Sequence, residues 1–182
     1  MVVPSRDQCL EMLTQHNMPA HIRRHSMLVT EVALVLAARL NGNGCRLDPD
    51  VVEAAALLHD IGKMQGLKTG ENHAELGARI LGGIVTEPIA RIVAEHIYLD
   101  DSQTGGPLTE SLIVNYSDKR VKHDRIVTIR ERFEDLIERY AKSPPQAVML
   151  RAKLDLYIAL ERTIFSHLAI APHGPEIMGI TI

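Results

Sequence analysis

The sequence predicts an all-α fold. Hydrophobic residues recur at helical spacing in nearly every segment, and no segment alternates apolar and polar residues as a half-buried strand does. Aromatic residues make up 3% of the chain and Trp is absent, so the core is expected to consist of aliphatic side chains. With 182 residues, the chain is long enough for one domain with a substantial core.

Capping and turn residues divide the chain into a series of expected helices. Ser5 is a suitable N-cap for the first helix, and Asp48-Pro49 is a suitable start for the third. Gly- and Pro-containing segments separate the later ones, and the tail 171–182 is expected to be loosely attached. The expected helices span about 5–17, 20–40, 49–62, 73–81, 87–98, 108–118, 119–139 and 146–168, with loops at 64–72 and 99–107.

Composition excludes several classes of function. The formal net charge of −3 argues against a general nucleic-acid-binding protein. The charged segment 119–139 has nearly equal numbers of acids and bases and one aromatic residue, which favours a solvated amphipathic helix. No apolar run reaches the roughly 20 residues of a membrane span, and the N-terminus turns polar too early for a signal peptide. Cys9 and Cys45 have no CxxC spacing, so we expect reduced thiols and a cytoplasmic location.

Five of the expected helices each place a histidine or an aspartate on an apolar face. In the helix 20–40, for example, His25 lies in a stripe with Ile22, Val29 and Val32. The helix 49–62 carries an imidazole and a carboxylate side by side after the apolar run AAALL. The full set is His25, His59, Asp60, His73, His96 and Asp118.

Each of these residues also has a purely structural interpretation. A single histidine on an apolar face is more often a hydrogen-bonded core residue than a ligand, and Asp118 could cap a helix or bond to Tyr116 or Arg125. That interpretation would have to hold separately in five helices, and it leaves two buried carboxylates to be neutralised. Imidazoles and carboxylates that meet in a dry site are typical ligands of divalent metals. The pattern therefore predicts a metal site.

The same residues carry a family resemblance. His25, the segment HDIGK at 59–63 and Asp118 within YSDK resemble the H…HD…D signature of the HD-domain superfamily of metal-dependent phosphohydrolases. His73 in HAELGARIL and His96 in IVAEH are similar to the two extra histidines of its dinuclear members. The resemblance extends over roughly residues 20–132.

The resemblance implies a fold and a ligand set. We expect one HD domain over residues 1–182: an HD-domain helical bundle with a core at about 20–141, and an additional C-terminal helix and tail at about 144–182. One or two divalent ions are implied: iron, manganese, zinc, cobalt or nickel, with magnesium also open. One metal would be held by His25, His59, Asp60 and Asp118, and Asp60 would bridge to a second metal on His73 and His96.

Branches of the superfamily differ in their further motifs. The cyclic-dinucleotide phosphodiesterases would show His and Glu after His96 and a later GYP, whereas Ile97 and Tyr98 follow here and GYP is absent. The stringent-response hydrolases are long multidomain chains. The small bacterial HD hydrolases of symmetrical dinucleoside tetraphosphates are more similar, but this chain shows too little of their pattern beyond the ligands to identify a substrate.

The resemblance implies hydrolysis of a phosphate ester or anhydride of a nucleotide-like small molecule by metal-activated water, with Asp60 in a catalytic, metal-bridging role. Lys63, three residues after Asp60, is the first candidate to contact phosphate or the leaving oxygen; the alternative is a solvated lysine at a helix C-terminus. Arg24, Lys119 and Lys122 are further phosphate-binding candidates.

Other functions fit these residues less well. His21 and His25 have HxxxH spacing, but Ile22 stands where a zinc protease carries its general-base Glu. Neither cysteine lies in a recognisable nucleophile motif. A non-catalytic or regulatory HD module that binds metal or nucleotide is the alternative function. The apolar face of the helix 146–168 could pack on the core or on a second subunit, so a homodimer stays open.

Overall fold

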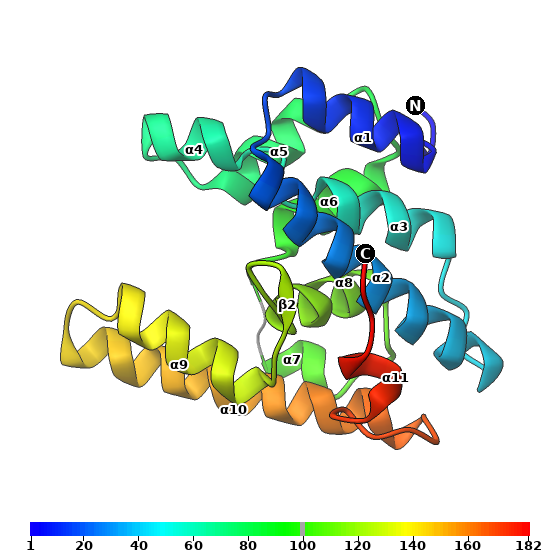
Figure 1. Ribbon diagram of the computed structural model, residues 1–182, viewed down its shortest axis with the longest axis vertical. Coiled ribbons are helices and arrows are strands. Elements are labelled where there is room, and N and C mark those ends of the chain that lie inside the picture. The colour runs from blue at the N-terminus through cyan, green and yellow to red at the C-terminus, as the bar shows by residue number, and fades with distance from the viewer. Residues whose placement is uncertain (99–100) are drawn as a thin grey trace.

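The computed structural model describes residues 1–98 and 101–182, and it confirms the all-α class (Figure 1). A two-stranded antiparallel hairpin accompanies the helices, and it pairs Val121 with Ile126 and Lys122 with Arg125. Within the described ranges, no helix has the length and apolar character needed to cross a membrane. The elements in chain order are α1 (Arg6–Gln15), α2 (Ala20–Gly42), α3 (Pro49–Leu58), α4 (Lys63–Thr69), α5 (His73–Leu81), α6 (Glu87–Glu95), α7 (Asp101–Thr104), α8 (Glu110–Lys119), β1 (Val121–Lys122), β2 (Arg125–Ile126), α9 (Ile129–Tyr140), α10 (Pro144–Ser166) and α11 (Pro175–Met178).

Helix α3 lies at the centre of the bundle. It packs against α1, α2, α6 and α8, and its residues from Ala54 to Leu58 are completely buried. Asp48 caps its N-terminus by accepting hydrogen bonds from the backbone N–H groups of Asp50 and Val51, and Pro49 occupies the first turn. The apolar run that precedes His59 is therefore the core helix of the protein.

The predicted loop 64–72 contains a helix instead, α4. It follows a tight turn at residues 59–62, so α3 ends at Leu58 rather than at Gly62. A Cβ at Gly62 would lie 2.3 Å from the carbonyl oxygen of His73, which shows that glycine is required there by the close approach of α5. Gly70, with φ of 79°, ends α4 in the left-handed conformation. The prediction failed because the glycines of this segment serve packing and capping rather than an open loop.

The prediction of a single helix over 119–139 was also wrong. The chain leaves α8 after Lys119, forms the β1–β2 hairpin and begins α9 at Ile129. Thr128 and Glu131 form a capping box, in which the Thr128 hydroxyl accepts from the backbone of Glu131 and the Glu131 carboxylate accepts from the backbone of Thr128. His123 turns the hairpin with φ of 58°. The capping box of the segment TIRE at 128–131 starts a new helix here, although the helical periodicity of the apolar residues continues through the segment.

The tail is docked on the protein rather than loosely attached. Ile177 in α11 is fully buried, and the buried Arg120 donates to the carbonyl oxygen of Pro172 at 2.9 Å. Of the predicted loop 99–107, residues 99–100 lie outside the described residues and Asp101–Thr104 forms the short helix α7.

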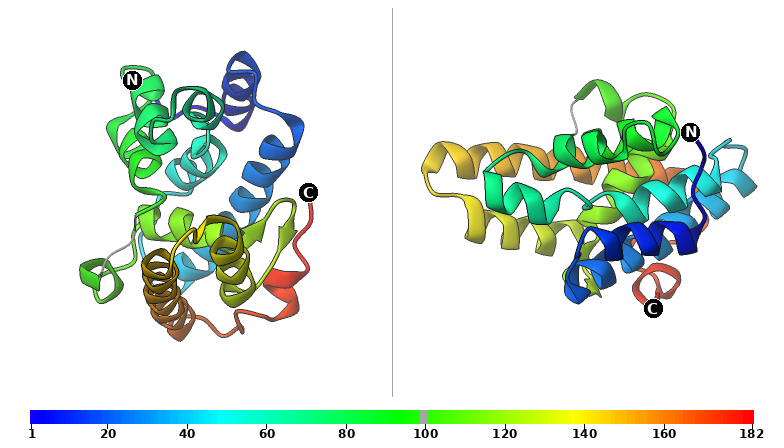
Figure 2. Two further views of the ribbon diagram at one scale, coloured as in Figure 1. Left: turned by 90° about the vertical axis from the view of Figure 1, so that its left-hand side faces the viewer. Right: turned by 90° about the horizontal axis from the view of Figure 1, so that it is seen from above.

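Helices α9 and α10 form an antiparallel pair along one side of the bundle, away from α1 and α4 (Figures 1 and 2). The rings of Phe133 and Tyr157 meet between them at 5.2 Å. Pro144 and Pro145 lie in the first turn of α10, where the missing N–H groups cost nothing, so α10 starts earlier than predicted. Val148 and Met149 near that end are exposed.

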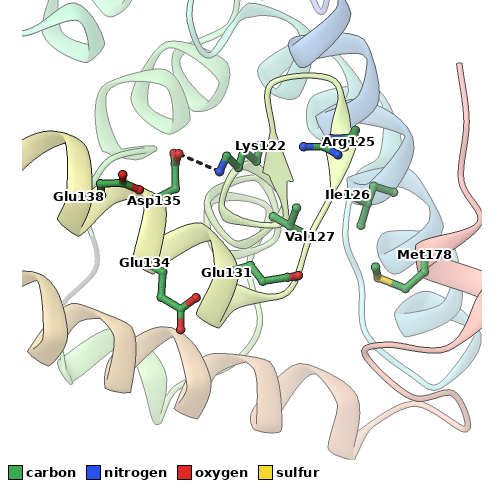
Figure 3. A pocket seen from close by; sticks show the side chains of 9 residues that line it. All are labelled: Lys122, Arg125, Ile126, Val127, Glu131, Glu134, Asp135, Glu138 and Met178. Carbon is green, nitrogen blue, oxygen red and sulfur yellow. Dashed lines mark ion pairs between the residues drawn. The ribbon is translucent and has the colours of Figure 1, made fainter.

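One carboxylate on α9 forms ion pairs with three basic side chains beside the hairpin. The buried Asp135 pairs with Lys122 at 2.8 Å, Arg139 at 3.0 Å and Arg132 at 3.3 Å. Figure 3 shows the Lys122–Asp135 pair at a cavity of about 430 Å³ between β2, α9 and Met178. Burial disfavours the ionised form, but Lys122, Arg139 and Arg132 together hold the pKa of Asp135 below its ordinary value.

Asp135→Asn is expected to lower the free energy of unfolding at neutral pH by about 2 kcal/mol, because charged hydrogen bonds are lost. The carboxylate has a lowered pKa in the folded state, so its contribution is complete above about pH 4 and disappears as the pH falls through the folded-state value. The difference between wild type and variant should therefore be constant near neutral pH and shrink as the pH falls below about 4. Urea unfolding across this range measures it, with the exposed Glu134→Gln as control. A difference that does not change with pH would contradict the argument.

Candidate metal centre

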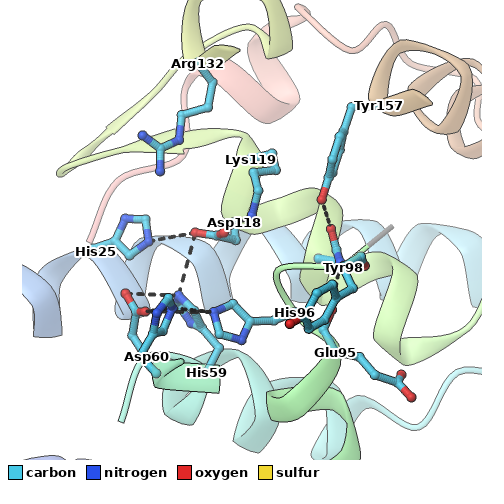
Figure 4. Close-up of polar contacts among 12 residues, drawn as sticks. His25, His59, Asp60, Glu95, His96, Tyr98, Asp118, Lys119, Arg132 and Tyr157 are labelled. Atoms are coloured by element: carbon cyan, nitrogen blue, oxygen red, sulfur yellow. Dashed lines mark hydrogen bonds and ion pairs between the residues drawn. The ribbon is translucent and has the colours of Figure 1, made fainter. Parts of the chain in front are cut away.

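The structure brings the six predicted histidines and aspartates together from five helices and the turns that follow them, and Figure 4 labels all of them except His73. α2 and α8 supply side chains from within the helix, whereas the others stand at helix ends or in the turn after α3. All except His73 are buried. They are His25 on α2, His59 and Asp60 after α3, His73 at the start of α5, His96 after α6, and Asp118 on α8.

The first group of ligand atoms surrounds Asp118. Its Oδ1 lies 3.0 Å from Nε2 of His25 and 3.7 Å from Nε2 of His59. Nε2 of His59 is also 3.5 Å from Oδ2 of Asp60. Atoms of His25, His59 and Asp118 lie within 4.8 Å of one another, as a single ion would require.

The second group surrounds the other oxygen of Asp60. Oδ1 lies 3.3 Å from Nε2 of His73 and 3.9 Å from Nε2 of His96, and these two nitrogens are 3.3 Å apart. Asp60 thus presents Oδ2 toward His59 and Oδ1 toward His73 and His96. One carboxylate faces both groups, which is the arrangement of a bridging ligand.

Backbone carbonyls set the tautomers of three histidines. Nδ1 of His25 contacts the carbonyl oxygen of His123 at 3.0 Å, and Nδ1 of His59 and His96 contact those of Ala56 and Val93 at 2.7 Å. A carbonyl can only accept, so each Nδ1 carries a proton, and Nε2 is the ring nitrogen that faces the carboxylates. Such contacts commonly orient metal-binding histidines.

That arrangement needs positive charge at its centre. Lone pairs facing carboxylate oxygens repel each other unless protons or a cation lie between them, and the buried Nε2 of His59 has no hydrogen-bond partner among the described residues. A divalent cation would satisfy this nitrogen and both carboxylates at once. The donor set therefore fits a metal ion.

The charges of the cluster are strongly coupled. Burial opposes ionisation of Asp60 and Asp118, but His59 together with Lys63 for the first, and Lys119 together with His25 for the second, hold the pKa of each carboxyl well below its usual range. Burial also disfavours charge on His59, yet Asp60 and Asp118 raise its pKa. Burial, followed by the neighbouring His59, lowers the pKa of His96 to about 3. Both carboxylates therefore stay ionised and His96 stays neutral, as metal ligands must be.

A polar network holds the turn that carries His96. The side-chain amide of Asn115 on α8 donates to the carbonyl oxygens of Glu95 at 3.2 Å and Tyr98 at 2.6 Å. The hydroxyl of Tyr157 on α10 donates to Oδ1 of Asn115 (Figure 4). Helices α8 and α10 thus fix the position of His96, a contribution that helical periodicity does not reveal.

Two of the four predicted phosphate-binding residues lie at the cluster. Nζ of Lys63 is 2.7 Å from Oδ2 of Asp60, and Lys119 pairs with Asp118. Lys63 reaches Asp60 across the turn, not along a continuous helix. Arg24 is beside His25 in sequence, but its side chain is 57% exposed and faces Asp124 at 4.0 Å. The structure does not bring Arg24 or Lys122 to the cluster, since Lys122 pairs with Asp135.

A cavity of about 410 Å³ opens from the cluster. Asp60, Asp118 and two of the histidines line it, together with Lys63 and Lys119. Helix α9 supplies the residues that the sequence analysis missed: Arg132, Leu136 and Tyr140. The capping box at Thr128 would have located the start of α9, but only the tertiary structure shows which of its faces meets the cavity.

Comparison with known proteins agrees with this geometry. The model of the HD domain family matches residues 22–134, more than half of the chain. The chain belongs to the HD domain family. The family is one of metal-dependent phosphohydrolases whose domains bind divalent metals, and this HD domain has buried His/Asp groups that could hold one.

Two curated proteins are similar to this chain in sequence. It is 30% identical over 162 residues to a tRNA (cytidine(56)-2'-O)-methyltransferase from Thermoplasma volcanium, an alignment that covers 78% of this chain and 46% of that protein. It is 29% identical over 131 residues to an uncharacterized protein from Methanocaldococcus jannaschii, covering 67% of this chain and 76% of that protein. The chain thus spans less than half of the methyltransferase. No solved structure matches significantly.

Proposed function

We propose that this HD domain is a metal-dependent phosphohydrolase that cleaves a phosphate ester or anhydride of a nucleotide-like small molecule. The observation that carries the proposal is the position of Asp60, whose Oδ2 faces His59 and whose Oδ1 faces His73 and His96, next to a buried Nε2 of His59 that has no hydrogen-bond partner among the described residues. Most buried polar atoms have a hydrogen-bond partner, so a buried ring nitrogen without one, directed at two carboxylates, supports a bound cation.

The residues divide into two proposed ligand sets. His25, His59 and Asp118 would hold one metal, His73 and His96 would hold a second, and Asp60 would contact both. Bound divalent metal supplies a hydroxide nucleophile at neutral pH and neutralises charge on phosphate. The chain contributes the anionic carboxylates, the oriented rings and the burial that limits competing water.

Two lysines supply the remaining charge. Nζ of Lys63 contacts Asp60 while the side chain is 39% exposed, so it can reach a substrate at the cavity without leaving the cluster. Lys119 is more deeply placed, at 11% exposure, and is held by Asp118. We propose that Lys63 contacts a phosphate or leaving-group oxygen and that Lys119 adds fixed positive charge beside Asp118.

The cavity also has an apolar part to its lining. Its apolar residues are Leu67, Ile97, Leu136 and Tyr140, of which Leu67 and Tyr140 are largely exposed. A phosphate bound at the lysines would thus share the cavity with an apolar surface and an aromatic ring, which suit the base and sugar of a nucleotide. This contrast supports a small organic phosphate over inorganic pyrophosphate.

Metal removal provides the direct test. Protein treated with a chelator should lose turnover and regain it on addition of a divalent transition ion. Metal present at about 100 times its dissociation constant should also stabilise the fold by about 2.7 kcal/mol, seen as a higher Tm. A screen of mononucleotides, dinucleoside polyphosphates and cyclic nucleotides measures turnover, thermal unfolding measures Tm, and elemental analysis measures the bound metal. RNA-derived phosphate esters belong in the screen because one relative is named a tRNA methyltransferase.

The same screen distinguishes the hydrolase from the alternative, a regulatory HD module. Metal-dependent stabilisation without turnover of any substrate would favour a regulatory, metal-binding HD module. Neither bound metal nor turnover with any added ion would overturn the proposal altogether.

A further inference from the structure

Arg132 is a cation in the cavity with an unsatisfied donor. It lies on α9, one turn after the start of the helix, and lines the same cavity as Asp60, Asp118 and Lys119. Its side chain is 17% exposed, and its Nε is buried without a hydrogen-bond partner among the described residues. Figure 4 shows the guanidinium directed toward His25 and Asp118, on the same side as Lys119. A buried charged donor is costly unless a ligand completes its hydrogen bonds.

The carboxylate next to Arg132 does not neutralise it. Nη1 contacts Oδ2 of Asp135 at 3.3 Å, but Asp135 also pairs with Lys122 and Arg139. Three cations share one carboxylate, so the group has a net positive charge. Asp135 orients one edge of the guanidinium and leaves Nε free to bind another group.

A second cation lies close to the first. Lys119 lines the same cavity as Arg132. Asp118 balances Lys119 but is itself among the proposed metal ligands. Lys63, Lys119 and Arg132 thus place three cations in the lining of one cavity, which favours an anionic ligand.

We propose that Arg132 is a substrate-binding residue that donates to the non-bridging oxygens of the phosphate. The inference rests on the proposed function and extends it to a residue on α9, outside the metal-binding pattern. A guanidinium suits this role because its planar set of donors matches the geometry of phosphate oxygens. In this proposal Arg132 has the phosphate-binding role that the sequence pattern suggested for Arg24 and Lys122, both of which lie away from the cluster.

Phosphate binding to metal-loaded protein provides the test. Calorimetric titration with inorganic phosphate should show binding that is about 10- to 100-fold weaker in Arg132→Gln, the range expected for losing hydrogen bonds to a charged group. Arg130→Gln is the matched control, because Arg130 is exposed on the same helix. Arg132→Lys should recover part of the affinity, since it restores the charge without the planar donors. Metal content and circular dichroism should match wild type in all three variants.

The outcomes separate this inference from the proposed function. Unchanged phosphate affinity in Arg132→Gln at equal metal content would overturn the role of Arg132, even if the wild-type protein hydrolyses nucleotides. Weakened phosphate binding together with absence of turnover on every ester would support Arg132 and overturn the hydrolase. Where turnover is found, the same variant should lower kcat/KM by a similar factor.

Discussion

Asp60→Ala is expected to remove both bound metal and activity. The carboxylate faces His59 through one oxygen and His73 through the other, so its loss opens both proposed ligand sets together. It also leaves Lys63 without its partner. We expect turnover to fall by about a thousandfold or more, beyond the loss caused by removing a single stabilising donor. Metal content by elemental analysis should fall in the same sample.

A remote aspartate controls for general effects of removing an acid. Asp155 is exposed on α10, and Asp155→Ala should keep metal content and turnover. Circular dichroism distinguishes a lost site from a lost fold, because the core helix α3 precedes Asp60 and does not depend on its side chain. Asp60→Ala protein that retains metal and activity would contradict the bridging role.

Arg120→Ala is expected to have the largest effect on stability. Arg120 is completely buried and donates through Nη1 to the Tyr116 hydroxyl at 2.6 Å and through Nε to the carbonyl oxygen of Val127 at 2.8 Å. It also contacts Glu161 at 3.4 Å and the carbonyl oxygen of Pro172. Removing one partner of a buried charged network leaves the others unpaired, which costs about 3–5 kcal/mol. Urea unfolding with a chelator present measures the loss without the contribution of metal.

The same residue joins segments that are distant in sequence. Its contacts link the end of α8 to Val127 after β2, to α10 and to the tail, so the variant should also expose residues 169–182 to proteolysis before global unfolding. Arg162→Ala, exposed on α10, serves as the control and should change stability by less than about 0.5 kcal/mol. A cost below about 1 kcal/mol for Arg120→Ala would show that the network contributes little.

Local sequence accounts for most of the helices and for the membership of the cluster. The apolar run before His59, the caps at Ser5 and Asp48, and the helical spacing of His25 and Asp118 are properties of short segments. Such segments determine which face of a helix is buried, and therefore which polar side chains must point inward. Five helices with polar residues on their buried faces can meet in few ways around one core, which is why the six side chains could be named together.

Contacts between distant segments decided the rest. The β1–β2 hairpin, α4 and the docked tail depend on partners far along the chain: His25 bonds the His123 carbonyl, Gly62 lies against α5, and Arg120 holds Pro172. Arg132 enters the cavity only because α9 begins at Ile129, ten residues later than a helix continued from Lys119 would begin. Periodicity contains no information on where a chain turns back, since loop closure is determined by tertiary packing. By itself, the sequence determined an all-α HD domain and the six side chains of its polar centre. The tertiary structure decided which ring nitrogens face the carboxylates, which lysines pair with them, and which residues of α9 line the cavity.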